Sequence, residues 1–145
     1  MIGLLQRVTQ ASVSVEDECI ASIDTGLLVL IGIEKADDRA SADRLLQKLL
    51  AYRVFADAQG RMNCSLSDIQ GGLLLVPQFT LVADTRKGLR PSFASAAAPD
   101  QAHALFAYLA ERAQALYGQA ACGRFGADMQ VALVNDGPVT FQLRV

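Results

Sequence analysis

The sequence predicts an α/β fold in which a mixed β-sheet, closed into a barrel-like sandwich, carries two main helices. A length of 145 residues fits a single domain covering residues 1–145. A hydrophobic content of 52% with a net charge of only -2 allows a substantial core and argues against disorder. Strand-like segments are interrupted twice by segments whose apolar residues recur at helical spacing, which is typical of mixed α/β order.

The N-terminal part of the chain predicts four strands. Met1–Val8 and Ala11–Val15 are the first two, and in the second, valines alternate with serines. Glu18–Ile23 continues the alternation, and Thr25-Gly26 marks a turn. Leu27–Ile33 is a continuous apolar run, which indicates a strand buried on both faces.

A helix is predicted from about Ala40 to Tyr52. Asp37 and Asp38 precede it and supply capping groups and negative charge at its N-terminus. Within the segment, leucines recur at helical spacing with charged residues between them: Leu45, Leu46, Leu49 and Leu50. This stripe predicts that one face of the helix packs on the sheet.

Two extended segments are expected between the helices. Asp57–Gly60 is a turn, and Arg61-Met62-Asn63 after it is a short strand. Gly71-Gly72 opens a second buried strand, Leu73–Val76, which is expected to lead into Gln78–Val82.

A second helix is predicted after the polar, basic loop Asp84–Ser95. Pro99 and Asp100 are suited to its first turn, and Gly118 is a natural C-terminal cap. Its apolar face carries five residues: Leu105, Phe106, Leu109, Ala113 and Leu116.

Composition argues against several classes of protein. Three widely spaced cysteines, an odd count without a CxxC pair, favour a reduced compartment over a disulfide framework. His103 is the only histidine, so we expect no zinc site, no Ser-His-Asp triad and no metal or other cofactor. We expect no membrane span, because no stretch of about 20 uncharged apolar residues exists. With no signal-peptide pattern at the start, a cytoplasmic location is expected.

The slightly acidic net charge argues against a broad basic surface that binds nucleic acid. Any RNA contact must therefore use a local patch, and the best candidate is Arg86, Lys87 and Arg90, which outnumber the nearby Asp84. These cations either contact phosphates or belong to a solvated surface loop, and the pattern alone supports both interpretations equally.

Pro77-Gln78-Phe79-Thr80-Leu81 follows the second buried strand. Period-two alternation places Gln78 and Thr80 on one face and Phe79 on the other. An amide beside a hydroxyl is suited to hold a carbonyl or a ribose hydroxyl. An ordinary strand with a polar outer face explains the same residues, and spacing alone favours it.

Two strands, Met129–Val134 and Val139–Val145, are predicted at the end of the chain, joined by Asn135-Asp136-Gly137-Pro138. All four joining residues favour turns, so the sequence alone favours a plain hairpin turn. A turn would not need Pro138 just after the glycine, however. An X-Pro bond can be cis, which would fix two successive carbonyls in a rigid direction.

Taken together, these segments resemble the D-aminoacyl-tRNA deacylase family. The resemblance runs nearly end to end and implies that family's fold and its activity. That activity is hydrolysis of the ester bond of D-aminoacyl-tRNA to free D-amino acid and tRNA, a proofreading step in translation. The resemblance rests on the Met1 start, Gly60-Arg61-Met62-Asn63, Gln78-Phe79-Thr80-Leu81, Ala83-Asp84-Thr85-Arg86-Lys87-Gly88, Arg90-Pro91-Ser92-Phe93 and Asn135-Asp136-Gly137-Pro138-Val139-Thr140.

The resemblance also implies a homodimer with active sites at the subunit interface. Gly137-Pro138 would form a cis peptide that enters the partner's site, where its carbonyls capture the amino group and leave no room for an L side chain. Met129 would join this dipeptide in binding the substrate, and Arg86, Lys87 and Arg90 would bind tRNA. Glycyl-tRNA, mischarged on tRNA(Ala), would also be accepted, because glycine has no side chain to reject.

By the same resemblance, Gln78, Phe79 and Thr80 are the catalytic residues. Thr80 could act as a nucleophile, although no histidine or lysine is evidently placed to activate it. Alternatively, the enzyme positions a water, the terminal ribose 2′-hydroxyl assists, and backbone N–H groups near Phe79 stabilise the oxyanion. We prefer the second route because an aminoacyl ester is already activated.

One departure from the family pattern and one alternative function remain. The family often has serine where this chain has Pro77, so a serine hydroxyl cannot contribute here. The alternative is a non-catalytic nucleic-acid-binding dimer on the same scaffold, motivated by the basic patch.

Overall fold

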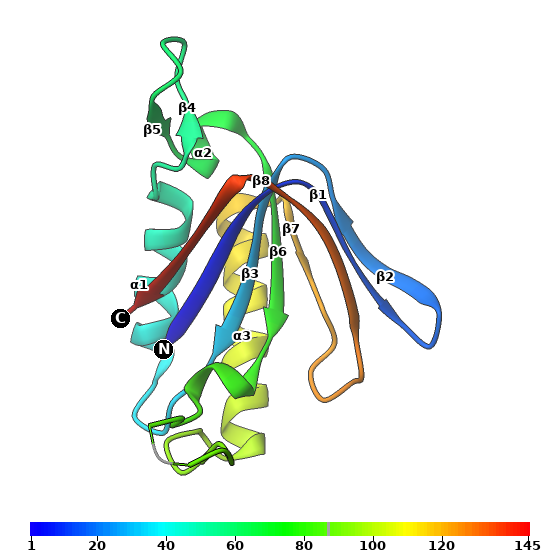
Figure 1. Cartoon of the computed structure of the whole chain (residues 1–145), viewed down its shortest axis with the longest axis vertical. Coiled ribbons are helices and arrows are strands. Elements are labelled where there is room, and N and C mark those ends of the chain that lie inside the picture. Colours follow the sequence, from blue (N-terminus) through cyan, green and yellow to red (C-terminus); the bar gives the residue numbers. More distant parts are fainter. Residues whose placement is uncertain (87) are drawn as a thin grey trace.

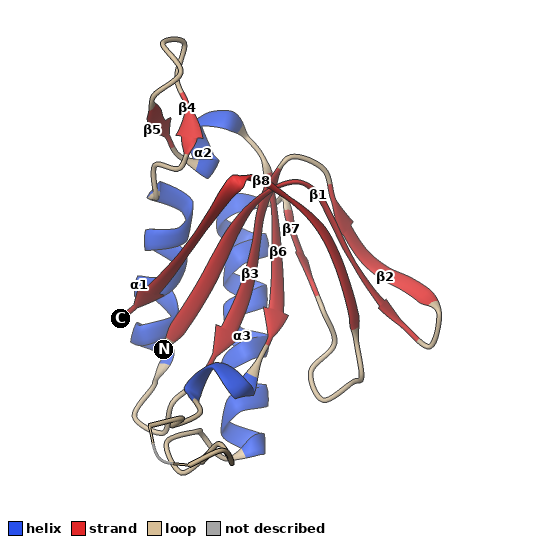
Figure 2. Cartoon of the chain, in the orientation of Figure 1, coloured by secondary structure: helices blue, strands red, loops and turns tan. Residues whose placement is uncertain are grey.

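A six-stranded mixed sheet packs beside three helices in the computed structural model, which describes residues 1–86 and 88–145 (Figures 1 and 2). The sheet contains β1 (Ile2–Val15), β2 (Glu18–Ile23), β3 (Gly26–Gly32), β6 (Gly72–Pro77), β7 (Ala120–Cys122) and β8 (Gln130–Arg144). The helices are α1 (Arg39–Ala51), the single-turn α2 (Leu66–Ile69) and α3 (Pro99–Tyr117). A short hairpin, β4 (Phe55–Ala56) and β5 (Met62–Cys64), stands apart, and η1 (Phe79–Val82) is a 3-10 helix. The predicted α/β class is confirmed.

β1 organises the sheet. Its first half pairs with β3 on one side, its second half pairs with β2, and β8 runs antiparallel along its other edge. Parallel pairing then joins β3 to β6 and β6 to β7. β2 comes close to β6 and β7, so the curved sheet nearly closes into a barrel (Figure 1). Gly72 permits this approach, because a Cβ there would lie 2.7 Å from the Cβ of Ile23.

Two apolar clusters use the two faces of the buried strands. The larger cluster packs Leu27 of β3 and Leu73 of β6 against the long helices α1 and α3. These two helices lie on the same side of the sheet (Figure 2). The smaller cluster lies on the opposite face, where β1, β2 and β8 curl over Leu28 and Leu74. Successive residues therefore point to opposite faces. This arrangement confirms that Leu27–Ile33 contains a strand buried on both faces.

The long helices begin and end close to where the sequence predicts. Asp38 is the N-cap of α1 and accepts a hydrogen bond from the Ser41 N–H at 2.8 Å. Pro99 opens α3, and Gly118 ends it in the left-handed conformation with φ of 77°. Among the described residues, no helix combines the length and apolar character of a membrane span.

The predicted division into strands is wrong at three places. Met1–Val8 and Ala11–Val15 form one long strand, β1. Met129–Val134 and Val139–Val145 likewise form the single strand β8, because both parts pair with β1 in one direction instead of folding back on each other. Gln78–Val82 does not extend β6. The paired partner β3 ends at Gly32, so the chain turns to local hydrogen bonds and forms η1.

Candidate active site

A pocket of about 520 Å³ opens at the carboxyl ends of β3 and β6. Ile31 and Val76 line it from the two strands, and Ala102 lines it from α3. The segment from Phe125 to Met129, just before β8, lines it as well. A mostly apolar hollow at the carboxyl ends of parallel strands is a common place for a ligand site.

Two of the three predicted catalytic residues, Gln78 and Phe79, line this pocket at the start of η1, whereas Thr80 does not line it. The Gln78 N–H is fixed by a hydrogen bond of 2.7 Å to the Ile31 carbonyl. The Gln78 side-chain amide donates to the Thr80 hydroxyl. Because a turn of helix replaces the expected strand, Gln78 and Thr80 meet through their side chains, and Phe79 is 61% exposed.

The backbone of η1 is also arranged for chemistry. The first N–H groups of a helix have no acceptor within that helix, and in η1 they belong to Phe79 and Thr80. No side-chain cap accepts a hydrogen bond at this end. Both groups can therefore stabilise negative charge on an oxygen bound at the pocket.

The loop after η1 packs back against it. The Phe93 ring packs against the Phe79 ring, with centroids 5.1 Å apart and the ring planes tilted by 51°. Asp84 and Ser92 pair through two backbone hydrogen bonds, and the Ser95 hydroxyl donates to the Val82 carbonyl at 2.6 Å. The loop that carries the predicted basic patch is thus anchored beside the pocket.

Within the patch, Arg86 is already paired. Its guanidinium donates to both carboxylate oxygens of Asp84, at 2.9 and 2.7 Å. This hydrogen bonding holds the pKa of the Asp84 carboxyl well below its usual range and raises the pKa of Arg86. Arg90 is exposed, and Lys87 lies outside the described residues. Among the described cations, the patch has less positive charge available for phosphates than the sequence implies, because Asp84 neutralises Arg86.

Asn135–Pro138 forms a protrusion from β8 instead of a hairpin turn. Val8 pairs with Asn135, and Gln6 pairs with Thr140. Residues 136–139 of β8 therefore lie opposite a single residue of β1, Arg7. The Gly137-Pro138 bond is cis, as the resemblance implies. Asp136, Gly137 and Pro138 are exposed.

Two side chains brace the protrusion. The Asn135 side chain accepts from the Val139 N–H at 2.7 Å and donates to the Thr140 hydroxyl at 3.0 Å. Arg7 donates through Nε to the Asp136 carbonyl at 3.0 Å and through Nη1 to the Val54 carbonyl at 2.6 Å. The protrusion therefore holds a fixed shape although it extends into solvent.

The protrusion and the pocket lie at opposite ends of the sheet in one chain. The protrusion begins at Asn135, which pairs with Val8, and Val8 pairs with Gly26 at the start of β3. The pocket begins at Ile31, five residues further along β3, a distance of about 17 Å at roughly 3.3 Å per residue. Met129 lines the pocket, whereas the protrusion residues do not. One chain therefore brings Met129, but not Gly137 and Pro138, to the pocket that Gln78 and Phe79 line.

The sequence patterns did not predict several residues of the site. Arg7 carries no recognisable signal, because a single arginine in a strand is typical of an ordinary exposed position. Ala96, Ala97 and the Phe125–Asp128 segment line the pocket only through long-range packing. The described residues contain no group of three or more His, Cys, Asp or Glu side chains placed to hold a metal ion.

Comparison with known proteins agrees with this geometry. The family model described as D-Tyr-tRNA(Tyr) deacylase matches residues 4–144. The D-aminoacyl-tRNA deacylase of Stutzerimonas stutzeri is 64% identical over 143 residues, and that of Pseudomonas fluorescens is 63% identical over 144. In both cases 99% of each chain is covered.

Two solved structures share the fold. One, a c-Myc DNA unwinding element binding protein, superposes with a TM-score of 0.95 at 38% identity and covers 100% of this chain and 99% of its own. The other, a probable eukaryotic D-amino acid tRNA deacylase, has a TM-score of 0.87 at 18% identity, with 99% and 98% covered.

The fold and the site define a small mixed α/β protein with a mostly apolar pocket at the carboxyl ends of two parallel strands, beside the 3-10 turn η1. The chain belongs to the D-Tyr-tRNA(Tyr) deacylase family. It is an enzyme that hydrolyses the ester bond between a D-amino acid and tRNA.

Proposed function

We propose that this deacylation takes place in a composite site, in which the pocket of one subunit is completed by the Asn135–Pro138 protrusion of a second copy. The observation that carries this proposal is the placement of the protrusion. It is exposed, braced by Arg7 and Asn135, and about 17 Å along the sheet from its own pocket. A rigid exposed segment far from its own pocket is suited to fill the pocket of a twofold-related partner.

In this site, the carbonyls of the protrusion accept hydrogen bonds from the α-ammonium group of the amino acid. A fixed ammonium and a fixed ester carbonyl leave one direction for the side chain. The D side chain points into open space, and the L side chain collides with the main chain of Gly137 and Pro138. Glycyl-tRNA fits as well, because glycine has no side chain in either direction.

A positioned water performs the chemistry. The water attacks the ester carbonyl and gives up a proton, the bond to the ribose oxygen breaks, and the neighbouring 2′-hydroxyl relays that proton to the leaving oxygen. The N–H groups of Phe79 and Thr80 stabilise the oxyanion. The Gln78 amide donates to the Thr80 hydroxyl and so offers it no base, which favours an orienting role for Thr80 over a nucleophilic one.

The tRNA backbone runs over the loop that follows η1. Arg86 and Arg90 contact phosphates there, and Arg86 exchanges Asp84 for a phosphate when it does so. Lys87 is assigned the same role from the sequence. We place the enzyme in the cytoplasm, where aminoacyl-tRNA is used.

Hydrolysis of D-Tyr-tRNA against L-Tyr-tRNA tests the function directly. We expect turnover of the D substrate and little of the L substrate, and equal rates would contradict the proposal. A tRNA whose terminal ribose lacks the 2′-hydroxyl should react slowly while binding normally.

Subunit mixing tests the composite site. Gln78→Ala impairs the pocket, and Asn135→Ala releases the protrusion, so each variant alone should be nearly inactive. After the subunits are exchanged, half of the dimers are mixed and each carries one intact site, which restores about a quarter of wild-type activity. No recovery would place both segments in the same subunit's site.

A non-catalytic nucleic-acid-binding role is the second candidate, favoured by the name of the 38%-identical structure, which describes DNA binding. It predicts salt-sensitive binding to single-stranded DNA that survives Thr80→Ala and therefore does not depend on deacylation.

A further inference from the structure

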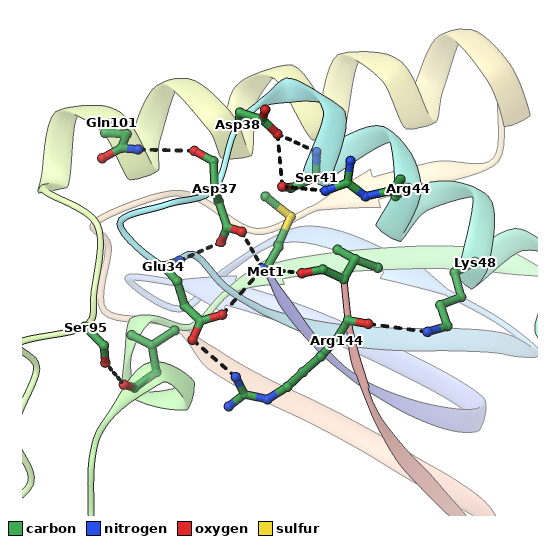
Figure 3. A network of polar contacts seen from close by, with 12 residues as sticks. Met1, Glu34, Asp37, Asp38, Ser41, Arg44, Lys48, Ser95, Gln101 and Arg144 are labelled. Atoms are coloured by element: carbon green, nitrogen blue, oxygen red, sulfur yellow. Dashed lines mark hydrogen bonds and ion pairs between the residues drawn. The ribbon is translucent and has the colours of Figure 1, made fainter.

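An ion cluster at the meeting point of the two chain ends, with Met1 and Asp37 buried at its centre, is not used by the proposed mechanism. The Met1 ammonium group contacts the Asp37 carboxylate, lies 3.5 Å from a Glu34 carboxylate oxygen and donates to the Val145 carbonyl at 3.2 Å (Figure 3). Met1 and Asp37 are 1% and 8% exposed. Arg144 closes the outer side through an ion pair of 3.2 Å to Glu34.

The same carboxylate shapes the turn that follows β3. Asp37 accepts a hydrogen bond of 2.7 Å from the Glu34 N–H, and the Asp37 N–H donates back to the Glu34 carbonyl at 3.0 Å. Asp37 therefore joins a buried cation to residues 33–37, which we call the 33–37 turn. Residues 34–37 have no strand ladder to hold them, so these bonds fix their position.

The 33–37 turn is attached to the wall of the active-site pocket. The Ala97 N–H donates to the Ile33 carbonyl at 3.0 Å, and Glu34 forms an isolated β-bridge with Ala96. Ile33, Ala96 and Ala97 all line the pocket.

Gln101, at the start of α3, anchors the outer side of the 33–37 turn. Its side-chain amide donates to the carbonyls of Lys35 and Asp37, each at 3.2 Å (Figure 3 shows the second bond). The turn is thus held between the buried ammonium and the first turn of α3.

We propose that Asp37 is a positioning residue for deacylation: through the Met1 ammonium and the 33–37 turn, it fixes the pocket wall formed by Ile33, Ala96 and Ala97. This inference rests on the proposed function, which makes that pocket the active site. The contact between Asp37 and the Met1 ammonium gives the 33–37 turn a charge-assisted anchor, in addition to the neutral hydrogen bonds that join this turn to Ala97 and Gln101.

Asp37→Asn tests the proposal with little change of shape. The amide keeps one acceptor but presents an NH₂ group to a buried ammonium or to the Glu34 N–H, so the 33–37 turn must shift. Because a misplacement of about 1 Å can cost up to 100-fold in rate, we expect kcat for D-Tyr-tRNA to fall about tenfold or more. The Kd for deacylated tRNA should stay within about twofold, because the phosphate contacts are untouched.

Hydrogen exchange supplies a readout that does not depend on turnover. The Ala97 and Lys35 N–H groups, which bond to Ile33 and Ser95, should exchange faster in Asp37→Asn, whereas N–H groups within β1 should not. Asp43→Asn is the matched control. It breaks a polar contact between α1 and α3 that does not touch the 33–37 turn, and it should lower the Tm without changing kcat.

If Asp37→Asn does not fold, Gln101→Ala weakens the other anchor of the same turn. It should lower kcat about threefold, a smaller loss than 1 Å of misplacement would cause. The proposal would be overturned if the variant that folds, Asp37→Asn or Gln101→Ala, kept wild-type kcat. It would also be overturned if Asp43→Asn, at the same Tm as that variant, lost as much kcat. Absence of turnover in the unmodified protein would instead refute the proposed function, and the exchange experiment would still decide whether Asp37 holds the wall.

Discussion

Gly137→Ala is the sharpest test of the protrusion, because the structure leaves no room for a side chain there. Gly137 has φ of 134°, a region that residues with a Cβ rarely adopt. A Cβ at this position would lie 2.7 Å from Cγ2 of Val139 and 3.1 Å from Nη2 of Arg7.

The cost has two parts. The unfavourable backbone conformation contributes about 1–3 kcal/mol. The contact with Val139 adds to it, because that side chain is buried and β-branched and has few alternative rotamers. The protrusion can relieve the backbone strain and the contact with Val139 by moving, so we expect only a modest loss of stability. The same movement displaces the carbonyls that bind the substrate, so kcat/KM for D-Tyr-tRNA should fall about 100-fold.

Thermal unfolding and deacylation rates on D- and L-Tyr-tRNA measure the two effects separately. Gly60→Ala is the control, since Gly60 also has positive φ, at 76°, but a Cβ there would meet no atom within 4 Å. It should lose about 1 kcal/mol of stability and keep its activity. A Gly137→Ala protein with wild-type D and L rates would refute the argument that this segment reads the substrate.

Contacts elsewhere in the molecule support three more predictions. Arg7→Lys removes the guanidinium group that donates to the carbonyls of Asp136 and Val54. It should lower kcat/KM about tenfold in the deacylation assay, with a near-normal circular dichroism spectrum. Asp37→Ala leaves the Met1 ammonium buried with weaker partners and should cost about 3–5 kcal/mol in denaturant unfolding, and a loss below about 1 kcal/mol would contradict the burial argument. Hydrogen bonds from Arg112 and Tyr108 lower the pKa of Asp43, so its contribution to stability is present above the unfolded pKa of about 3.9 and is lost as the pH falls through the lower folded value. Asp43→Asn should therefore flatten the acid limb of a Tm–pH curve, and an unchanged slope would show that Asp43 is not linked to folding.

Local patterns in the sequence predicted most of the elements. The stripes at Leu45–Leu50 and Leu105–Leu116 located α1 and α3, and Gly118 located the end of α3 within a residue. α2 had a recognisable signal that we did not use, the capping box formed by Ser65 and Asp68. These elements depend on neighbours within a few residues, which is why spacing is sufficient to find them.

The site was predicted only in part. Gln78, Phe79 and Thr80 were identified as a unit, yet their expected strand geometry was wrong, because whether a chain continues as a strand depends on the length of its neighbour, here β3. The Asn135–Pro138 segment was identified by resemblance, whereas the local preference for a turn pointed to a hairpin. Pairing with β1 decided the outcome.

By itself, the sequence determined the fold class, both long helices, the doubly buried strands and the family to which the chain belongs. Each is encoded by local periodicity or by an ordered set of short motifs. Only the tertiary structure decided that Arg7 braces a segment 129 residues away, that Asp84 neutralises Arg86, and that Met1 is buried against Asp37. Such contacts follow from strand register and loop packing, in which residues distant in sequence meet only after the whole core has formed.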